Sequence, residues 1–140
     1  MAGGVIWDKV NAARLPALTG GRLYFGTSTG DVFELYLYPS TWTLGTNYYR
    51  VATAGGSAIQ TQPLAQDGIL YVSNSNGKIY VFDADSGAGP SLMMTYTLFG
   101  LAATGDLSRD SVGSGRIYVG TSAGRVYSIN PFVDPTPAVP

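Results

Sequence analysis

Short apolar runs, separated by small polar residues, form the basic pattern of this sequence. Residues 23–25, 69–72 and 79–82 are such runs, and they are rich in β-branched and aromatic side chains, which favour strands. A strand with one face in water alternates apolar and polar residues, whereas these runs are continuous. The pattern therefore predicts strands that are covered on both faces.

Three segments of the sequence align without a gap at a spacing of 47 residues. They begin at residues 21, 68 and 115 and read GRLYFGTSTGDVFEL, GILYVSNSNGKIYVF and GRIYVGTSAGRVYSI. Each segment predicts a hairpin of two strands. Gly30, Gly77 and Gly124 occupy the same place in the three hairpins, where we expect the turn to require a positive φ.

Two further strands are expected in each repeat, one leading directly into the hairpin and one before it. In chain order these segments are 5–7 and 16–19, 48–51 and 63–66, and 94–97 and 110–113. Four strands in each period of 47 residues are typical of a β-propeller blade. We therefore predict an all-β fold of three four-stranded antiparallel blades in an incomplete ring. The expected blade boundaries, with strand exchange between repeats, are about 5–47, 48–93 and 94–133.

Composition and charge narrow the range of functions. Only 12% of the residues are charged and the net charge is −1 without a basic run, so we expect no nucleic-acid partner. The longest apolar-leaning stretch, 92–103, is shorter than the roughly 20 residues that cross a bilayer, so we expect no membrane insertion. Cysteine is absent, which leaves no disulfide framework. Residues 134–140 are rich in proline, which lacks the N–H donor, so we expect an extended tail there.

The repeat resembles the pyrroloquinoline-quinone (PQQ) type of propeller repeat. The resemblance is clearest at 21–35, 68–87 and 115–129, in the apolar-Tyr-Val strands, the Gly-Thr-Ser-x-Gly turns and the Asp-Ala-Asp-Ser-Gly segment at 83–87. It implies a propeller fold that dehydrogenases, outer-membrane assembly proteins, adhesins and pilus-associated proteins share. Quinoprotein dehydrogenases usually carry a tryptophan after the Asp-Ala segment, and none follows here. We therefore predict that the chain holds no cofactor.

Carboxylates are the remaining candidates for chemistry, because histidine is absent and His-dependent triads and metal sites are thereby excluded. Asp31 and Glu34 are three residues apart, so on a strand they should point to opposite faces, as ordinary turn and edge residues. Asp83 and Asp85 have the spacing of the start of a calcium-binding loop. The alternative is a blade-corner turn in which aspartates accept backbone amides. We favour the turn and predict no metal.

Tyrosine and arginine are the other candidates for ligand contact. Three tyrosines are in register with the repeat and are therefore expected in the core: Tyr24, Tyr71 and Tyr118. Four others are outside the register and could stack on a carbohydrate or a peptide: Tyr36, Tyr38, Tyr48 and Tyr49. Arg109 lies in the polar segment 106–110, which is interpreted as a binding loop or as a solvated connector with an Arg–Asp contact.

These patterns together predict a non-catalytic propeller module for binding, adhesion or structural assembly. We expect it in a larger secreted, cell-surface or periplasmic complex or filament. The alternative is a fragment of a PQQ-dependent dehydrogenase. Because a blade is apolar on both faces, the first and last blades should each expose one apolar face. A protein partner or further copies are expected to complete the propeller, with residues 5–7 able to join the last blade of another copy.

Overall fold

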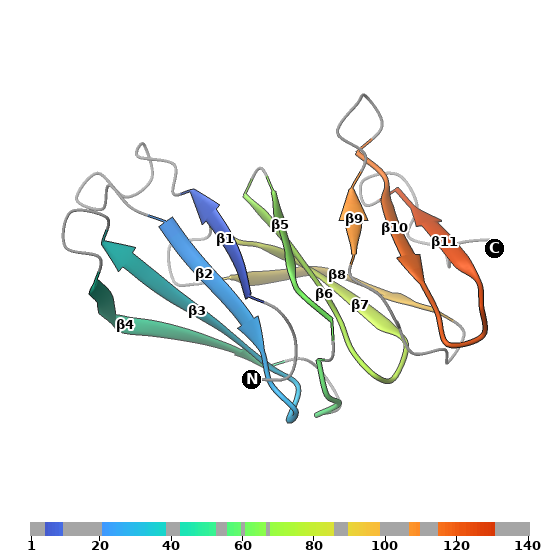
Figure 1. Ribbon diagram of the computed structural model, residues 1–140, viewed down its shortest axis with the longest axis horizontal. Coiled ribbons are helices and arrows are strands. Elements are labelled where there is room, and N and C mark those ends of the chain that lie inside the picture. The colour runs from blue at the N-terminus through green and yellow to red at the C-terminus, as the bar shows by residue number, and fades with distance from the viewer. Residues whose placement is uncertain are drawn as a thin grey trace.

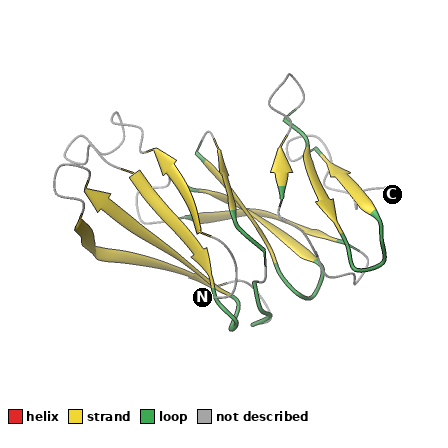
Figure 2. Cartoon of the chain, in the orientation of Figure 1, coloured by secondary structure: helices red, strands yellow, loops and turns green. Residues whose placement is uncertain are grey.

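The computed structural model contains only strands and loops in the residues that it describes (Figures 1 and 2). These residues are 5–9, 21–38, 43–52, 56–59, 61–66, 68–85, 90–98, 107–109 and 115–130. Their eleven strands form three antiparallel sheets, so the predicted all-β class is confirmed. Within this part of the chain, no helix is present that could cross a membrane.

Each sheet is a meander, because strands that follow one another in the chain are neighbours in the sheet. The first sheet contains β1 (Val5–Lys9), β2 (Gly21–Gly26), β3 (Asp31–Tyr38) and β4 (Thr43–Ala52). The second contains β5 (Leu64–Gln66), β6 (Ile69–Ser73), β7 (Lys78–Asp83) and β8 (Ser91–Thr97). The third contains β9 (Ser108–Arg109), β10 (Ile117–Gly120) and β11 (Val126–Ile129). Figure 1 shows the three sheets side by side in chain order.

The sheets divide the chain differently from the predicted boundaries. β4 pairs with β3 and β8 pairs with β7, so both strands belong to the sheet that precedes the expected boundary. The predicted segments 48–51 and 94–97 do form strands. Each is the last strand of a sheet, whereas each was expected to be the first strand of the next blade. A short connection to the preceding strand explains this, because closing a short loop costs little entropy. The residues 134–140, expected as a tail, lie outside the described residues.

The first strand of each sheet also differs in part from the expectation. Residues 63–66 lead into the hairpin as β5, as predicted. β1 pairs directly with β2, from Val5↔Phe25 to Lys9↔Gly21, so within the chain it is the first strand of the first sheet, and its expected role in another copy stays a prediction. β9 pairs with β10 although its residues were expected to form a loop. The expected strands 16–19 and 110–113 lie outside the described residues.

The same turn joins β2 to β3, β6 to β7 and β10 to β11. The backbone N–H of Gly30 donates to Thr27, that of Gly77 to Asn74 and that of Gly124 to Thr121, over 3.3, 3.1 and 3.0 Å. The three glycines have φ of 83°, 72° and 71°, the left-handed conformation predicted for them. A three-residue loop that ends in such a glycine is a common hairpin connection. The turn therefore fixes the register of each hairpin.

Two apolar layers hold the three sheets together. The layer between the first and second sheets consists of Tyr24, Val32, Ile59, Leu70, Val72, Tyr80, Phe82 and Ala84. The layer between the second and third sheets consists of Tyr71, Ile79, Val81, Tyr96, Leu98, Leu107, Ile117, Val119, Tyr127 and Ile129. Successive residues of β6 and β7 enter opposite layers, as the two-residue period of a strand requires. The middle sheet is thus covered on both faces, as its continuous apolar runs predict.

One of the three register tyrosines is not part of the core. Tyr24 and Tyr71 are 0% and 1% exposed, whereas Tyr118 is 36% exposed, so the prediction for Tyr118 is wrong. Its neighbours Ile117 and Val119 point into the layer against the second sheet. Tyr118 therefore points to the opposite face of the third sheet, where the repeat would need a further sheet to bury it.

Candidate functional site

Arg22 of β2 lies buried between the first and second sheets. Its side chain is 3% exposed. Nη1 donates to the carbonyl oxygen of Ala84, just after β7, and Nη2 donates to Oδ1 of Asp85 over 2.5 Å. Nη1 also lies 3.2 Å from the hydroxyl oxygen of Tyr24. The arginine thus fastens the end of β7 to the first sheet.

Glu34 lies on the other side of this guanidinium, with Oε2 at 3.7 Å from Nη1 of Arg22. Burial by itself lowers the pKa of Arg22, but the electrostatic effects of Tyr24, Asp85 and Glu34, with the Asp85 hydrogen bond, outweigh it and raise that pKa. The guanidinium therefore remains charged inside the protein. Glu34 is fully buried, so the expectation of an ordinary edge residue is wrong: it points inward with Val32, where Arg22 compensates its charge.

The acidic corner after β7 serves this contact. Oδ1 of Asp83 accepts the backbone N–H of Asp85 over 2.9 Å, which is the turn favoured from the sequence over a calcium loop. A side chain on Gly68, which has φ of +76°, would overlap the carboxylate of Asp85. Within the described ranges, no three His, Cys, Asp or Glu side chains form a group that could hold a metal ion. The corner is thus a structural element of the sheet contact.

Polar side chains in the turn of the first hairpin form hydrogen bonds within the turn. Oγ1 of Thr29 donates to Oδ2 of Asp31 over 2.9 Å, and the backbone N–H of Asp31 donates to Oγ1 of Thr27 over 3.0 Å. Asp31 is therefore a turn residue, as expected. Asp31 lies three residues before Glu34 on β3, so the two side chains point to opposite faces of the strand.

The tyrosine and arginine candidates are distributed over separate strands. Tyr36 and Tyr38 belong to β3, Tyr48 and Tyr49 belong to β4, and their side chains lie outside the described residues. Arg109 lies in β9 opposite Ile117. Its guanidinium packs over Gly115, where a Cβ would lie 3.2 Å from Nη2. Arg109 is partly buried, which differs from the exposed binding loop considered for it.

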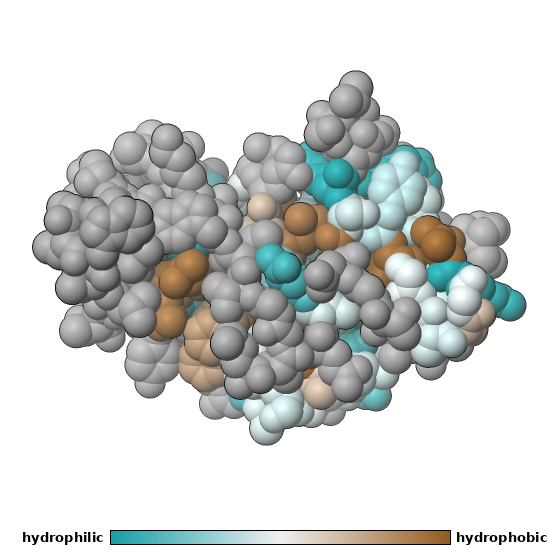
Figure 3. Space-filling model, viewed as in Figure 1, coloured by the Kyte–Doolittle hydropathy of each residue, from teal (hydrophilic) through white to brown (hydrophobic). Residues whose placement is uncertain are grey.

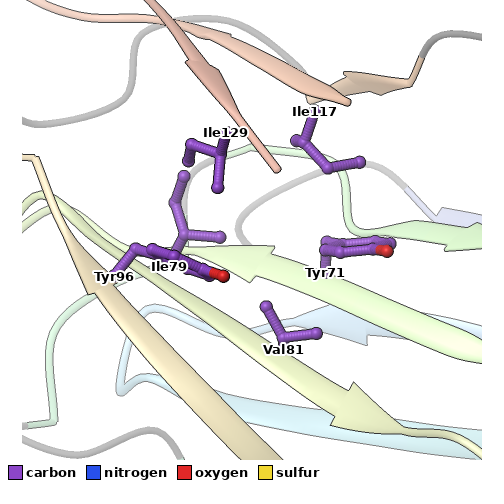
Figure 4. Close-up of a pocket in the computed structure, with 6 residues that line it drawn as sticks. All are labelled: Tyr71, Ile79, Val81, Tyr96, Ile117 and Ile129. Atoms are coloured by element: carbon purple, nitrogen blue, oxygen red, sulfur yellow. The ribbon is translucent and has the colours of Figure 1, made fainter. Parts of the chain in front are cut away.

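Figure 4 shows how the second and third sheets meet. Ile117 and Ile129 of the third sheet face Tyr71, Ile79 and Val81 of the middle sheet. The space that these side chains and Tyr96 enclose is too small for a water molecule. It is therefore a packed contact between two sheets rather than a ligand pocket.

The face of the third sheet that points away from the second sheet carries exposed apolar side chains. Val126 is 66% exposed and Tyr118 is 36% exposed. Ser128 and Gly120 are their cross-strand neighbours, paired as Tyr118↔Ser128 and Gly120↔Val126. In Figure 3, brown apolar surface and teal polar surface lie side by side over the part of the molecule that contains β9, β10 and β11. We call Tyr118, Gly120, Val126 and Ser128 the C-terminal face.

The first sheet carries a second apolar face that points away from the middle sheet. Leu23 pairs with Leu35 and Phe25 with Phe33. The two phenyl rings are stacked, with centroids 5.3 Å apart and an interplanar angle of 11°. All four side chains are partly buried. We call Leu23, Phe25, Phe33 and Leu35 the N-terminal face.

Sequence reasoning missed the burial of Arg22 and of Glu34. It placed Asp85 in a turn, without its contact to Arg22. Arg22 occupies the repeat position of Ile69, whose strand is covered on both faces, and this is the signal that could have revealed it. A charged residue at a covered position requires a partner of opposite charge. Searches against protein-family models and against curated proteins find no match to this chain.

Proposed function

We propose that the chain is a set of three β-propeller blades of the PQQ-like type that serves as a non-catalytic module for binding and assembly. The observation that carries the proposal is the exposure of Tyr118 and Val126 on the C-terminal face, with the partly buried N-terminal face at the other end of the stack of sheets. Contiguous apolar surface on a folded domain is typical of a site where another protein binds.

Three features support the propeller part of the proposal. The sheets are four-stranded or three-stranded meanders that pack face to face. The first strands of the first and second sheets lie close together, since β1 contacts β5, as the innermost strands of adjacent blades do. The same glycine turn recurs in all three hairpins. A radial arrangement of repeated meanders is the architecture that accounts for all three.

The charged groups support a structural role for the interior. Arg22, Glu34 and Asp85 are brought together between two sheets, and they compensate one another. Such a group holds a sheet contact rather than a substrate. Together with the low charge of the chain, this is consistent with a module in a secreted, cell-surface or periplasmic assembly, which could contact protein, peptide or carbohydrate.

An experiment on the C-terminal face tests the proposal. We expect the wild-type chain either to bind an environment-sensitive hydrophobic dye or to associate, as measured by light scattering. Val126→Asp should lose the association, or bind less of the dye where the wild type does not associate, and should keep the circular dichroism spectrum of the wild type, because Val126 is mostly exposed. Ala123→Asp, in the exposed turn before this strand, introduces the same charge and is the matched control, which should behave as wild type.

The alternative, a fragment of a PQQ-dependent dehydrogenase, gives a different result. Stoichiometric binding of the quinone and calcium, measured by absorbance and calorimetry on the purified chain, would favour it. A wild-type chain that neither binds the dye nor associates would contradict the binding module.

A further inference from the structure

The C-terminal face repeats the face by which the middle sheet contacts the third sheet. Tyr118 stands 47 residues after Tyr71, and Val126 stands 47 residues after Ile79. Tyr71 and Ile79 are 1% exposed because the third sheet covers them, whereas Tyr118 and Val126 remain exposed. The C-terminal face therefore has the same residue pattern as the face of the middle sheet that the third sheet covers. Among the described residues, no sheet covers the C-terminal face.

The N-terminal face repeats the face that provides such a cover. Leu23 and Leu35 stand 94 residues before Ile117 and Ile129, the two isoleucines that face Tyr71 and Ile79 across the internal contact (Figure 4). In both sheets the two residues form a cross-strand pair, Leu23↔Leu35 and Ile117↔Ile129. The C-terminal face thus corresponds to the face of the second sheet that contacts the third sheet. The N-terminal face corresponds to the face of the third sheet on the other side of that contact.

We propose that the partner of this module is a second copy of the same chain, bound head to tail. The C-terminal face of one copy packs on the N-terminal face of the next, so that Tyr118 and Val126 contact Leu23 and Leu35. This inference rests on the proposed function and names its partner. In this contact the sheets of the two copies continue the order of the sheets within one chain.

Arg116 lies beside the C-terminal face and would need a partner of opposite charge if the contact covered it. It stands 94 residues after Arg22, which bridges the first sheet to the second, so it occupies the corresponding rim of the proposed contact. Nε of Arg116 donates to Oγ of Ser128 over 2.6 Å, and Ser128 stands 94 residues after Glu34. The arginine is therefore held at the edge of the C-terminal face by a neutral partner.

The contact joins two different surfaces, and it is therefore heterologous. Such a contact forms either a closed ring or an open chain of copies. Two copies of three sheets give six, which is within the roughly four to eight blades that propellers close with. We therefore expect a closed pair of chains, whose mass by light scattering is twice that of the monomer.

Engineered cysteines test the pairing, because the natural chain has none. Val126→Cys and Leu35→Cys are purified separately, mixed and mildly oxidised. We expect a disulfide-linked dimer in the mixture and none in either sample alone, since the contact brings position 126 of one copy to position 35 of the other. Leu92→Cys, on the exposed part of edge strand β8, replaces Val126→Cys in the control mixture, which should not cross-link.

The outcomes separate this inference from the proposed function. Loss of the dimer in Val126→Asp, with the fold retained, supports the head-to-tail contact even where Leu35→Cys fails to fold. A monomeric wild type that binds the hydrophobic dye overturns the second copy as partner and leaves the binding module standing. A dimer in which Val126→Cys links to itself shows a symmetric contact and also overturns the inference.

Discussion

Nη2 of Arg22 lies 2.5 Å from Oδ1 of Asp85, although 63 residues separate the two in the chain. The contact crosses from the first sheet to the corner after β7, beside an otherwise apolar layer. A buried arginine needs such a partner because an uncompensated charge in the interior is costly. The pair therefore fixes how the two sheets are aligned, while the apolar residues supply most of the free energy of their contact.

Removal of the carboxylate should destabilise the chain strongly. We expect Asp85→Ala to lower the free energy of unfolding by about 3 kcal/mol, since it leaves the buried guanidinium with Glu34 alone at 3.7 Å. Urea denaturation followed by circular dichroism measures the change. Asp83→Ala, which removes only the acceptor of one backbone N–H, is the control and should cost about 1 kcal/mol.

A double variant distinguishes a lost ion pair from a damaged turn. Arg22→Met in the Asp85→Ala background leaves Glu34 buried without its cation, so the double variant should be unstable, but by less than the sum of the two single costs if Arg22 and Asp85 interact. A double variant that is less stable than Asp85→Ala by the full cost of Arg22→Met would show that the two residues act independently.

Gly26 should not tolerate a side chain, because the sheets approach closely there. A Cβ at Gly26 would overlap Cγ2 of Ile59, whose backbone N–H donates to the carbonyl of Thr27 over 2.9 Å and so cannot move freely. We expect Gly26→Ala to cost about 2 kcal/mol of unfolding free energy. In an Ile59→Gly background, which also removes the Ile59 Cβ at 2.5 Å from the added atom, the same substitution should cost less, and equal costs in the two backgrounds would contradict the overlap.

Gly124 should be sensitive for a different reason. A Cβ at this position would meet no atom within 4 Å, but φ is +71°. Gly124→Ala should therefore cost about 1 kcal/mol through backbone conformation alone, and Gly124→Asn should cost less because asparagine adopts this conformation more readily. Ala123→Ser in the same exposed turn is the control and should leave the denaturation midpoint unchanged.

Much of this fold can be predicted from local patterns. The glycine turns follow from a conformation that other residues avoid, and Gly77 follows a residue type that also favours such turns. The continuous apolar runs at 69–72 and 79–82 predict burial on both faces, and the middle sheet has it. These features depend on residues close together in the chain, so the sequence pattern is sufficient to find them.

Features that depend on distant residues could not be predicted in the same way. The burial of Glu34 follows from Arg22 on the adjacent strand and from Asp85 on another sheet. The exposure of Tyr118 depends on whether a sheet lies beyond β10 and β11, which the repeat itself does not state. The place of Ser108 and Arg109 in β9 depends on a connection longer than the one between β5 and β6, and loop length has no signature in the apolar pattern.

Tyr80 should make the chain sensitive to alkaline pH. Burial raises the pKa of Tyr80 above its usual value of 10.0, and the effect of the Asn74 side chain opposes the shift without cancelling it. Because the folded state favours the neutral phenol, the stabilisation is fully present below about pH 10 and is lost as the pH rises through the folded-state pKa. One such proton changes the unfolding free energy by at most about 1.4 kcal/mol per pH unit.

The variant Tyr80→Phe removes this titration and keeps the ring. At pH 7 we expect it to be less stable than wild type by about 1 kcal/mol, since the interaction with the Asn74 side chain is lost. Above pH 10 the unfolding free energy of the wild type should fall more steeply than that of the variant, so the difference between them narrows. Denaturation curves at pH 7, 9, 10 and 11 measure it, and parallel pH profiles would show that Tyr80 ionises equally in the folded and unfolded states.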